Sequence, residues 1–302
     1  MKVFLTGATG FVGSVVAEKL KNKGYKVSGL ARNAESAAAL EEKNIKPIAG
    51  NLSDREILRN AANSAGAVIH TAFSHDFEDY NDAVELDRKV IHAFSEVLAQ
   101  TNKPLIVTSS SAVLGNTKTN EADEDYPFDI HSSRLFRGEV ERDVLQMSQI
   151  GIRGIVLRLP LFVYGRGGSS FLPFVIDQAK KDKSANFVGT GEQKVSAVHV
   201  EDAADLYRAA IENSTAKGLY NVSGEIVSMK EIAESVGRLL DLKTSGISEE
   251  KAKKKYGKMY EFLSADNRLN AEKARRELRW TPSSYHSILD DIENGSYRRF
   301  MD

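Results

Sequence analysis

The first thirteen residues contain the feature that most restricts how this chain can fold. A short run of strand formers, Lys2–Thr6, leads directly into three glycines, Gly7, Gly10 and Gly13. Residues 14–20 then show apolar side chains at helical spacing. Strand, glycine-rich turn and helix in this order form the context that a dinucleotide fingerprint requires. In such a turn, glycines permit the tight bend, the approach of backbone to a pyrophosphate, and close packing of helix on strand.

The amides at the start of this helix are the predicted anion-binding groups. Unpaired N–H groups and the positive end of the helix dipole both favour a phosphate there. The spacing is G-x-x-G-x-x-G instead of the commoner G-x-G-x-x-G, and a plain tight turn is the alternative interpretation. The run T-G-A-T-G-F-V-G at 6–13 resembles the extended branch of the short-chain dehydrogenase/reductase superfamily.

Charge and composition exclude several classes of protein. The 302 residues include 41 Lys and Arg against 42 Asp and Glu, so the chain has no basic footprint for nucleic acid or an anionic membrane surface. Without cysteine, a thiol nucleophile, a disulfide or a cysteine-ligated metal is impossible. No apolar run approaches the roughly 18 residues of a membrane span. We expect a soluble cytoplasmic protein with a small-molecule substrate and no metal, as either monomer or homodimer.

Further strand and helix units follow the first one. Strand-like runs recur at 26–31, 46–50, 67–72, 154–160 and 218–224, another begins at Pro104, and a long amphipathic helix is expected at 79–100. This alternation predicts an α/β fold, a Rossmann-type doubly wound parallel sheet with the nucleotide across its strand ends. A smaller, mostly C-terminal lobe would bind substrate. The predicted division is 1–165 for the dinucleotide-binding domain, with 195–224 returning to it, and 166–194 and 225–302 for the lobe.

The tip of the second strand predicts which nicotinamide cofactor is preferred. The position that usually carries an acidic group for the adenosine ribose is Ala31, and Arg32 follows it. A guanidinium offers a fork of donors to a 2′-phosphate, which a carboxylate would repel. We therefore predict NADP(H) in preference to NAD(H), with NAD(H) still possible. The alternative for Arg32 is an ordinary solvated loop residue.

The resemblance implies more cofactor contacts at the ends of later strands. Residues 67–72 match the family's V-I-H-x-A pattern, and the segment 157–168 resembles its L-R-P-x-x-V-Y-G-x-G signature. Asn51 departs mildly from the Gly-Asp-Leu that often ends the third strand, and His70 is expected to be structural. The predicted cofactor-binding residues are Gly7, Thr9, Gly10, Phe11, Val12, Gly13, Arg32, Asn51, Leu52, Thr71, Ala72, Phe73, Thr108, Ser109, Pro160, Leu161, Phe162 and Val163.

Two stretches supply candidates for catalysis. Residues 104–115 resemble the family's strand followed by S-S-x-x-V-Y-G, which puts Ser110 at the catalytic serine, with Ser111 as the fallback. A hydroxyl there can hydrogen-bond the oxygen of a substrate carbonyl or alcohol. His75, beside Asp76 just past the fourth strand, could relay protons near neutral pH, although a simple polar loop explains it as well.

The resemblance breaks at the family's Y-x-x-x-K helix. There the tyrosine transfers the proton, and the lysine depresses the tyrosine pKa and binds the ribose. Matching Glu139 to the glutamate after that motif puts His131 at the tyrosine and Leu135 at the lysine, as in atypical subgroups that keep only the nucleotide site. The candidate replacements are His131, His75 and Tyr164 for the proton donor, and Arg134 and Arg137 for the cation on the ribose.

Several local signals concern the architecture of the chain. Residues 197–203 resemble the family's V-H-V-x-D-x-A segment, in which His199 and Asp202 would brace the domain junction. Lys194 stands where sugar-nucleotide enzymes of the family often use a basic residue, and Trp280 is expected to anchor the lobe. Further expectations are a cap at Ser53 and Asp54, a capping box at Ser228 and Glu231, and a solvated helical face at 249–255.

Three functions remain open at this point. The first is an NADP(H)-dependent oxidoreductase on a carbonyl or alcohol, with Ser110 polarising the oxygen and the cofactor supplying the hydride chemistry. The second is a sugar-nucleotide epimerase or dehydratase that returns the hydride to its substrate. The third is a non-catalytic NADP-binding sensor or interaction protein. The missing dyad favours the third, whereas Ser110 favours the first two, and we lean towards an enzyme.

Overall fold

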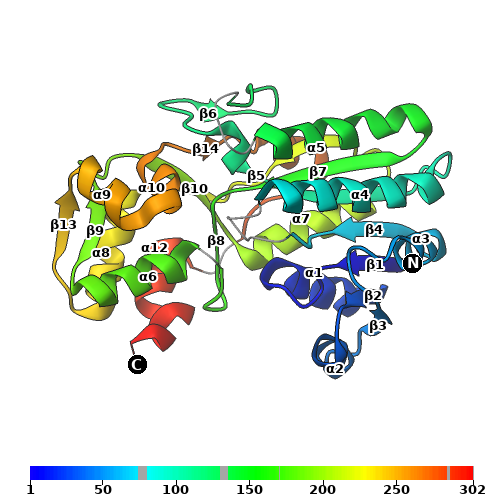
Figure 1. Cartoon of the computed structure of the whole chain (residues 1–302), viewed down its shortest axis with the longest axis horizontal. Helices are drawn as coiled ribbons and strands as arrows, with labels where there is room; N and C mark the ends of the chain where they lie inside the picture. Colours follow the sequence, from blue (N-terminus) through cyan, green and yellow to red (C-terminus); the bar gives the residue numbers. More distant parts are fainter. Residues whose placement is uncertain (74–79, 130–134, 170, 284–285, 302) are drawn as a thin grey trace.

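The computed structural model describes residues 1–73, 80–129, 135–169, 171–283 and 286–301. Figure 1 shows a large sheet flanked by helices on the right and a smaller lobe on the left, where the chain ends. His75, His131 and Arg134 lie outside the described residues. No helix in the described ranges is both long and apolar enough to cross a bilayer.

Seven parallel strands form the large sheet, in the order β11-β7-β5-β4-β1-β2-β3. The order reverses between β1 and β4, and a doubly wound sheet binds its ligand at the carboxyl ends beside that switch point. This confirms the predicted Rossmann-type fold. The strands are β1 (Lys2–Thr6), β2 (Lys26–Ala31), β3 (Lys46–Ala49), β4 (Ala67–His70), β5 (Pro104–Ser110), β7 (Arg153–Leu159) and β11 (Gly218–Asn221).

Helices cover both faces of the sheet because successive strand residues point to opposite sides. Val3 and Leu5 belong to a core shared with α1, α2, α7 and α11, whereas Phe4 packs in a second core with α3, α4 and α5. The predicted long helix is α4. The bounds are α1 (Phe11–Asn22), α2 (Ala34–Glu42), α3 (Arg55–Ser64), α4 (Tyr80–Leu98), α5 (Leu135–Gln146), α7 (Val200–Glu212) and α11 (Glu272–Leu278).

The smaller lobe has its own apolar core. A three-stranded sheet in the order β12-β10-β8 and a parallel pair β13-β9 support it. Its strands are β8 (Phe162–Tyr164), β9 (Ala185–Val188), β10 (Lys194–His199), β12 (Glu225–Ser228) and β13 (Thr244–Ile247). Its helical elements are α6 (Phe171–Asp182), α8 (Met229–Leu240), α9 (Glu249–Tyr256), η3 (Gly257–Met259), α10 (Tyr260–Ser264), α12 (Ile288–Asn294) and η4 (Ser296–Phe300).

The segment that was predicted to return to the first domain divides between the two sheets. β10 pairs with β8 and β12, whereas α7 packs on the large sheet and β11 forms its edge. We therefore place β8 and β10 with the smaller lobe and α11 with the large sheet, and propose the other lobe boundaries as predicted. Short elements link the parts: η1 (Ser111–Leu114), β6 (Glu121–Ala122), η2 (Met147–Ile150) and β14 (Arg268–Leu269).

The predicted helix signals have different outcomes. The capping box is present, since Ser228 Oγ accepts from the Glu231 amide and the Glu231 carboxylate accepts from the Ser228 amide. α9 buries only Ala252 and Tyr256, as expected for a solvated face. The cap at Asp54 is wrong, because its carboxylate turns back to accept from the Asn51 amide, 2.7 Å away, and leaves α3 without a side-chain cap.

Candidate functional site

The glycine-rich turn between β1 and α1 shows which glycines the protein itself requires. Gly7 has φ +74°, and a β-carbon there would lie 2.7 Å from the Ala72 amide nitrogen. A β-carbon on Gly13 would lie 2.1 Å from the Gly7 carbonyl oxygen. One on Gly10 would approach only that same oxygen, at 3.2 Å. That contact is tight, but apart from its chain neighbours no other described atom lies within 4 Å, so most of the space beside Gly10 is left for the approach of a ligand to the backbone.

The start of α1 offers amide donors to an anion. The Gly10 amide donates to the Gly7 carbonyl at 2.9 Å, and the Ser14 amide makes the first bond back along the helix, to Gly10, at 2.9 Å. No side chain caps this end and its first turn carries no acidic residue. The amides of 11–13 have no intrahelical acceptor, so the turn fits a dinucleotide pyrophosphate.

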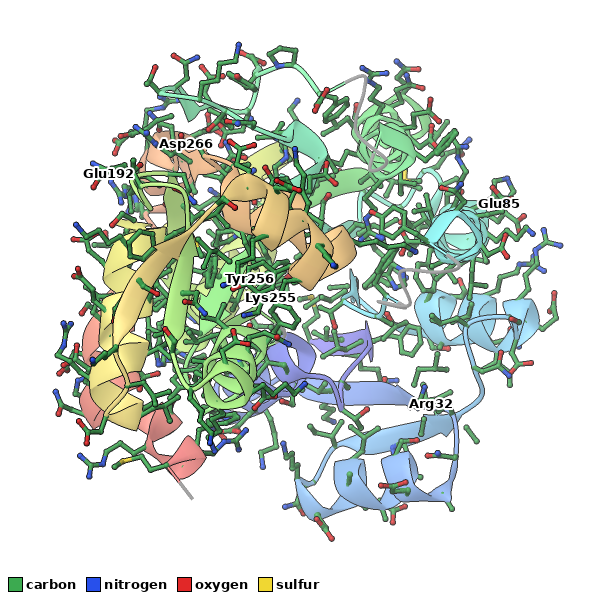
Figure 2. The ribbon with its side chains drawn as sticks, turned by 60° about the vertical axis from the view of Figure 1, so that its left-hand side comes forward. Arg32, Glu85, Glu192, Lys255, Tyr256 and Asp266 are labelled. Carbon is green, nitrogen blue, oxygen red and sulfur yellow. The ribbon has the colours of Figure 1, made fainter. Side chains whose placement is uncertain are left out.

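Arg32 lies exposed just past the carboxyl end of β2 (Figure 2). The described part of the chain provides its guanidinium with neither a hydrogen bond nor an ion pair. The next residue, Asn33, caps α2 by accepting from the Ser36 amide at 2.8 Å. Across the strand end, Asn51 Oδ1 accepts from the Ser53 amide at 2.7 Å. Arg32 is therefore the available cation at the predicted adenosine end.

A buried polar network lies at the carboxyl ends of β1, β4 and β5. His70, 1% exposed, places Nδ1 2.5 Å from Thr6 Oγ1 and Nε2 2.8 Å from Asp87 Oδ1. Thr71 Oγ1 donates to the Thr6 carbonyl at 2.8 Å, which ties the end of β4 to the end of β1. His70 is thus structural, as predicted.

Arg137, on α5, completes this network. Its guanidinium pairs with Asp87 at 3.0 Å, donates to the Thr108 carbonyl, and lies 4.1 Å from the centre of the Phe73 ring. Burial alone would raise the pKa of Asp87, but Arg137 and His70 together hold that pKa below its ordinary value. Because Arg137 is buried and neutralised by Asp87, the ribose role predicted for it is corrected to a structural one.

The three serines at the end of β5 differ sharply in environment. Ser109 is buried and donates to the Glu141 carboxylate, which in turn pairs with Arg158. Ser111 is completely buried, which excludes it as the fallback. Ser110 is half-buried, and its Oγ accepts from the Ala112 amide at 3.2 Å. That bond uses an acceptor position, so the Ser110 O–H stays available to donate to a substrate oxygen.

The other predicted contacts are placed as follows. Thr108 Oγ1 lies 2.6 Å from the hydroxyl of Tyr207, a buried residue of α7. Leu161 and Phe162 pack into the core of the smaller lobe and Val163 into that of the larger one, so cofactor contacts there would use backbone. The prediction of Tyr164 as a proton donor is wrong, because its side chain is buried and its hydroxyl donates to the Glu225 carboxylate at 2.7 Å.

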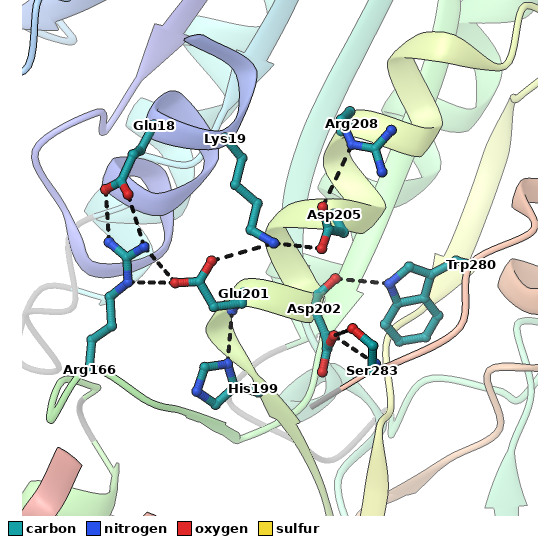
Figure 3. A network of polar contacts seen from close by, with 10 residues as sticks. All are labelled: Glu18, Lys19, Arg166, His199, Glu201, Asp202, Asp205, Arg208, Trp280 and Ser283. Carbon is teal, nitrogen blue, oxygen red and sulfur yellow. Dashed lines mark hydrogen bonds and ion pairs between the residues drawn. The ribbon is translucent and has the colours of Figure 1, made fainter. Parts of the chain in front are cut away.

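The junction of the lobes is a polar network around the start of α7 (Figure 3). His199 Nδ1 accepts from the Glu201 amide at 3.2 Å, and burial lowers the His199 pKa. Asp202 accepts from Ser283 through its carboxylate and, through its carbonyl, from Trp280 Nε1 at 2.8 Å. His199 and Asp202 thus lie at the junction, as expected, whereas Trp280 packs in the core of the large sheet and ties the segment after α11 to α7.

Sequence reasoning missed the buried ion pairs on α4 and α5. A signal for one of them exists, since Asp87 falls within the stripe Val84, Ile91, Phe94 and Leu98 that α4 buries against the sheet. A charged residue at a core position of an amphipathic helix needs a partner. In the described ranges, no three His, Asp or Glu side chains are grouped to hold a metal ion.

Comparison with known proteins places this geometry in a family. A model of the NAD-dependent epimerase/dehydratase family matches residues 3–223. An uncharacterized protein of Schizosaccharomyces pombe is 37% identical over 98% of this chain and 100% of its own length. The sterol-4-alpha-carboxylate 3-dehydrogenase (decarboxylating) of Dictyostelium discoideum is 27% identical over 76% of this chain and 73% of its own.

A solved structure shows the same fold. The dTDP-glucose 4,6-dehydratase of Bacillus anthracis, in complex with NAD, superimposes with a TM-score of 0.76 at 18% identity, covering 99% of this chain and 96% of that one. Fold, glycine-rich turn and family match agree with the resemblance seen in the sequence. The chain belongs to the NAD-dependent epimerase/dehydratase family, within the short-chain dehydrogenase/reductase superfamily.

Proposed function

We propose that this protein is an NADP(H)-dependent oxidoreductase that acts on a carbonyl or alcohol group of a small molecule. The observation that carries this proposal is the half-buried Ser110 hydroxyl, which keeps a free donor at the end of β5, two strands from β1 and its glycine-rich turn. Its neighbours Ser109 and Ser111 are buried. A dehydrogenase among the relatives supports the same reaction type.

Different residues of the chain would contact different parts of the bound dinucleotide and its substrate. The amides of 11–13 would hold the pyrophosphate, and Arg32 would hold the 2′-phosphate. When bound, the cofactor supplies hydride transfer at its nicotinamide. The Ser110 hydroxyl would donate to the substrate oxygen, where negative charge develops as a carbonyl accepts hydride. The buried Arg137 would fix the end of β5 through the Thr108 carbonyl, 29 residues away in the chain.

Two alternatives have specific support. The likeness in fold to dTDP-glucose 4,6-dehydratase, together with the exposed Lys194, favours a sugar-nucleotide epimerase or dehydratase. The absence of Y-x-x-x-K from the sequence favours a non-catalytic NADP-binding sensor. In the first case the cofactor would return unchanged after each turnover, and in the second no turnover would occur.

The test combines binding with turnover. NADPH and NADH are titrated first, and a panel of aldehydes, ketones and sugar nucleotides is then screened for NADPH oxidation or substrate conversion. We expect Ser110→Ala to lower kcat about 100- to 1000-fold, as for other donors to a developing oxyanion, with cofactor affinity unchanged. Ser111→Ala is the matched control, because it alters the adjacent buried serine. Tight binding without conversion of any compound would support the sensor and contradict an oxidoreductase.

A further inference from the structure

The loop that links β8 to α6 has a backbone that its own sequence does not favour. Gly165, Arg166, Gly167 and Ser169 have φ values of +107°, +53°, +62° and +104°. Glycine tolerates this region, whereas Arg166 and Ser169 carry β-carbons that disfavour it. Such a conformation persists only when its surroundings hold it in place.

The last helical turn of the described chain, η4, holds this loop from one side. The Tyr297 hydroxyl donates to the Gly168 carbonyl at 2.6 Å and accepts from the Gly165 amide at 3.2 Å. Ser296 Oγ accepts from the Gly167 amide at 2.7 Å, and Arg299 donates to the Gly167 carbonyl. Residues of η4 therefore hold the amides of Gly165 and Gly167 and the carbonyls of Gly167 and Gly168, although they lie about 130 positions later in the chain.

The loop holds the dinucleotide helix from its other side. Arg166 donates to Glu18 of α1 at 2.9 Å and to Glu201 of α7 at 2.6 Å (Figure 3). The ring of Phe11 packs directly on Gly168, where a β-carbon would lie only 2.3 Å from a ring carbon. Phe11 is the first residue of α1 and follows Gly10, so the loop supports the turn that would hold the pyrophosphate.

We propose that η4 is a positioning element for the cofactor, acting through the 165–168 loop on Phe11 and the amides at the start of α1. The inference rests on the proposed dinucleotide function and adds residues remote from the turn, chiefly Tyr297 and Arg299. Losing a bond from η4 lets the loop relax, and Phe11 then loses the surface that fixes its ring. The expected result is weaker dinucleotide binding, with unchanged chemistry once the cofactor is bound.

Adjacent arginines in η4 provide a matched pair for the test. Arg299 binds the loop, whereas the exposed Arg298 makes no side-chain hydrogen bond or ion pair in the described part of the chain. We expect Arg299→Met to raise the Kd and KM for NADPH roughly three- to tenfold, the effect of one hydrogen bond, with kcat at saturation unchanged. Arg298→Met should bind like the wild type, and Arg299→Lys, which keeps a donor, should recover most of the affinity.

Tyr297→Phe extends the test to the buried hydroxyl, and the exposed Arg299 variants decide the outcome if that protein does not fold. Wild-type affinity in Arg299→Met, or a loss of kcat with KM unchanged, overturns the positioning role while leaving the dinucleotide function intact. If the wild type binds neither NADPH nor NADH, the proposed function fails and this inference fails with it.

Discussion

At the scale of single residues, the three glycines of the first turn have separate causes. The fold itself requires Gly7 and Gly13, because β-carbons there would overlap Ala72 and the Gly7 carbonyl. Gly10 has φ −78°, which any residue adopts, and in the described part of the chain an added β-carbon would meet only the Gly7 carbonyl oxygen, at 3.2 Å. We therefore propose that the glycine at position 10 serves the approach of the ligand more than the fold.

Alanine at position 13 and alanine at position 10 should therefore have different effects. Gly13→Ala should destabilise the fold by about 1–3 kcal/mol or more, as overpacking does. Gly10→Ala should cost only about 1 kcal/mol, through the tight contact with the Gly7 carbonyl and the less favoured N-cap. It should nevertheless weaken NADPH binding at least about tenfold, because its methyl group occupies the ligand's approach. Urea unfolding and NADPH titration of both variants check this. Wild-type affinity in Gly10→Ala would show that no phosphate approaches the turn.

We expect the preference for NADPH over NADH to depend on Arg32. Arg32→Ala should raise the Kd for NADPH about 10- to 100-fold, the range of charge-assisted hydrogen bonds, and leave the Kd for NADH unchanged. Arg275→Ala, which removes an exposed arginine of α11, is the control. An equal loss for both nucleotides would contradict recognition of the 2′-phosphate by Arg32.

Sequence spacing was sufficient to find the residues of the turn and to favour Ser110 over Ser111, but it did not show how buried each serine is. Counting from Gly115 pointed to Ser110, with Ser111 as the fallback, and burial in the folded protein then excludes Ser111. Strand alternation and a 3-10 turn together decide which hydroxyl reaches the crevice, and that depends on tertiary packing. His75 and His131, the other predicted proton donors, fall outside the described residues.

At the scale of elements, a buried brace joins β4, α4 and α5. His70, Asp87 and Arg137 connect the three elements and reach the end of β5 at the Thr108 carbonyl. The helical period predicted α4 almost to its ends, because it depends only on local spacing. The partner of Asp87 lies 50 residues further on, and no local pattern contains that pairing.

Replacing Arg137 should lower the free energy of unfolding strongly, because Arg137 is the cation of this brace. Arg137→Met leaves the Asp87 carboxylate buried without its cation, so we expect a loss of about 3–5 kcal/mol in the free energy of unfolding. Arg88→Met breaks an exposed pair with Asp143 and should stay within about 0.5 kcal/mol of the wild type. Urea denaturation of both measures this, and equal small losses would contradict a structural role for Arg137.

At the scale of the whole molecule, the sequence predicted the doubly wound sheet correctly, because seven strand–helix signals repeat in order. It did not predict that β10 would leave that sheet for the smaller lobe. Its apolar pattern suits either sheet, and the choice depends on the edges that β8 and β12 offer.

The lobe junction predicts how stability depends on pH. Burial lowers the His199 pKa in the folded state below its ordinary value of 6.5, so the unfolded chain binds the proton more tightly. Its contribution is complete above about pH 6.5 and is lost as the pH falls towards the folded-state pKa. His199→Asn keeps a helix-capping acceptor and should make the decline below about pH 6.5 shallower. Parallel declines in both proteins, measured by urea unfolding, would exclude His199 as the titrating group.

The chain contains one tryptophan, and it is the indole bound to the Asp202 carbonyl at the junction. Its fluorescence therefore reports on a single known location, without a label or an engineered probe. A shift to longer wavelength would signal solvent entry between α7 and the segment that follows α11. Compared with far-ultraviolet dichroism, this emission would reveal whether the junction opens before the helices melt.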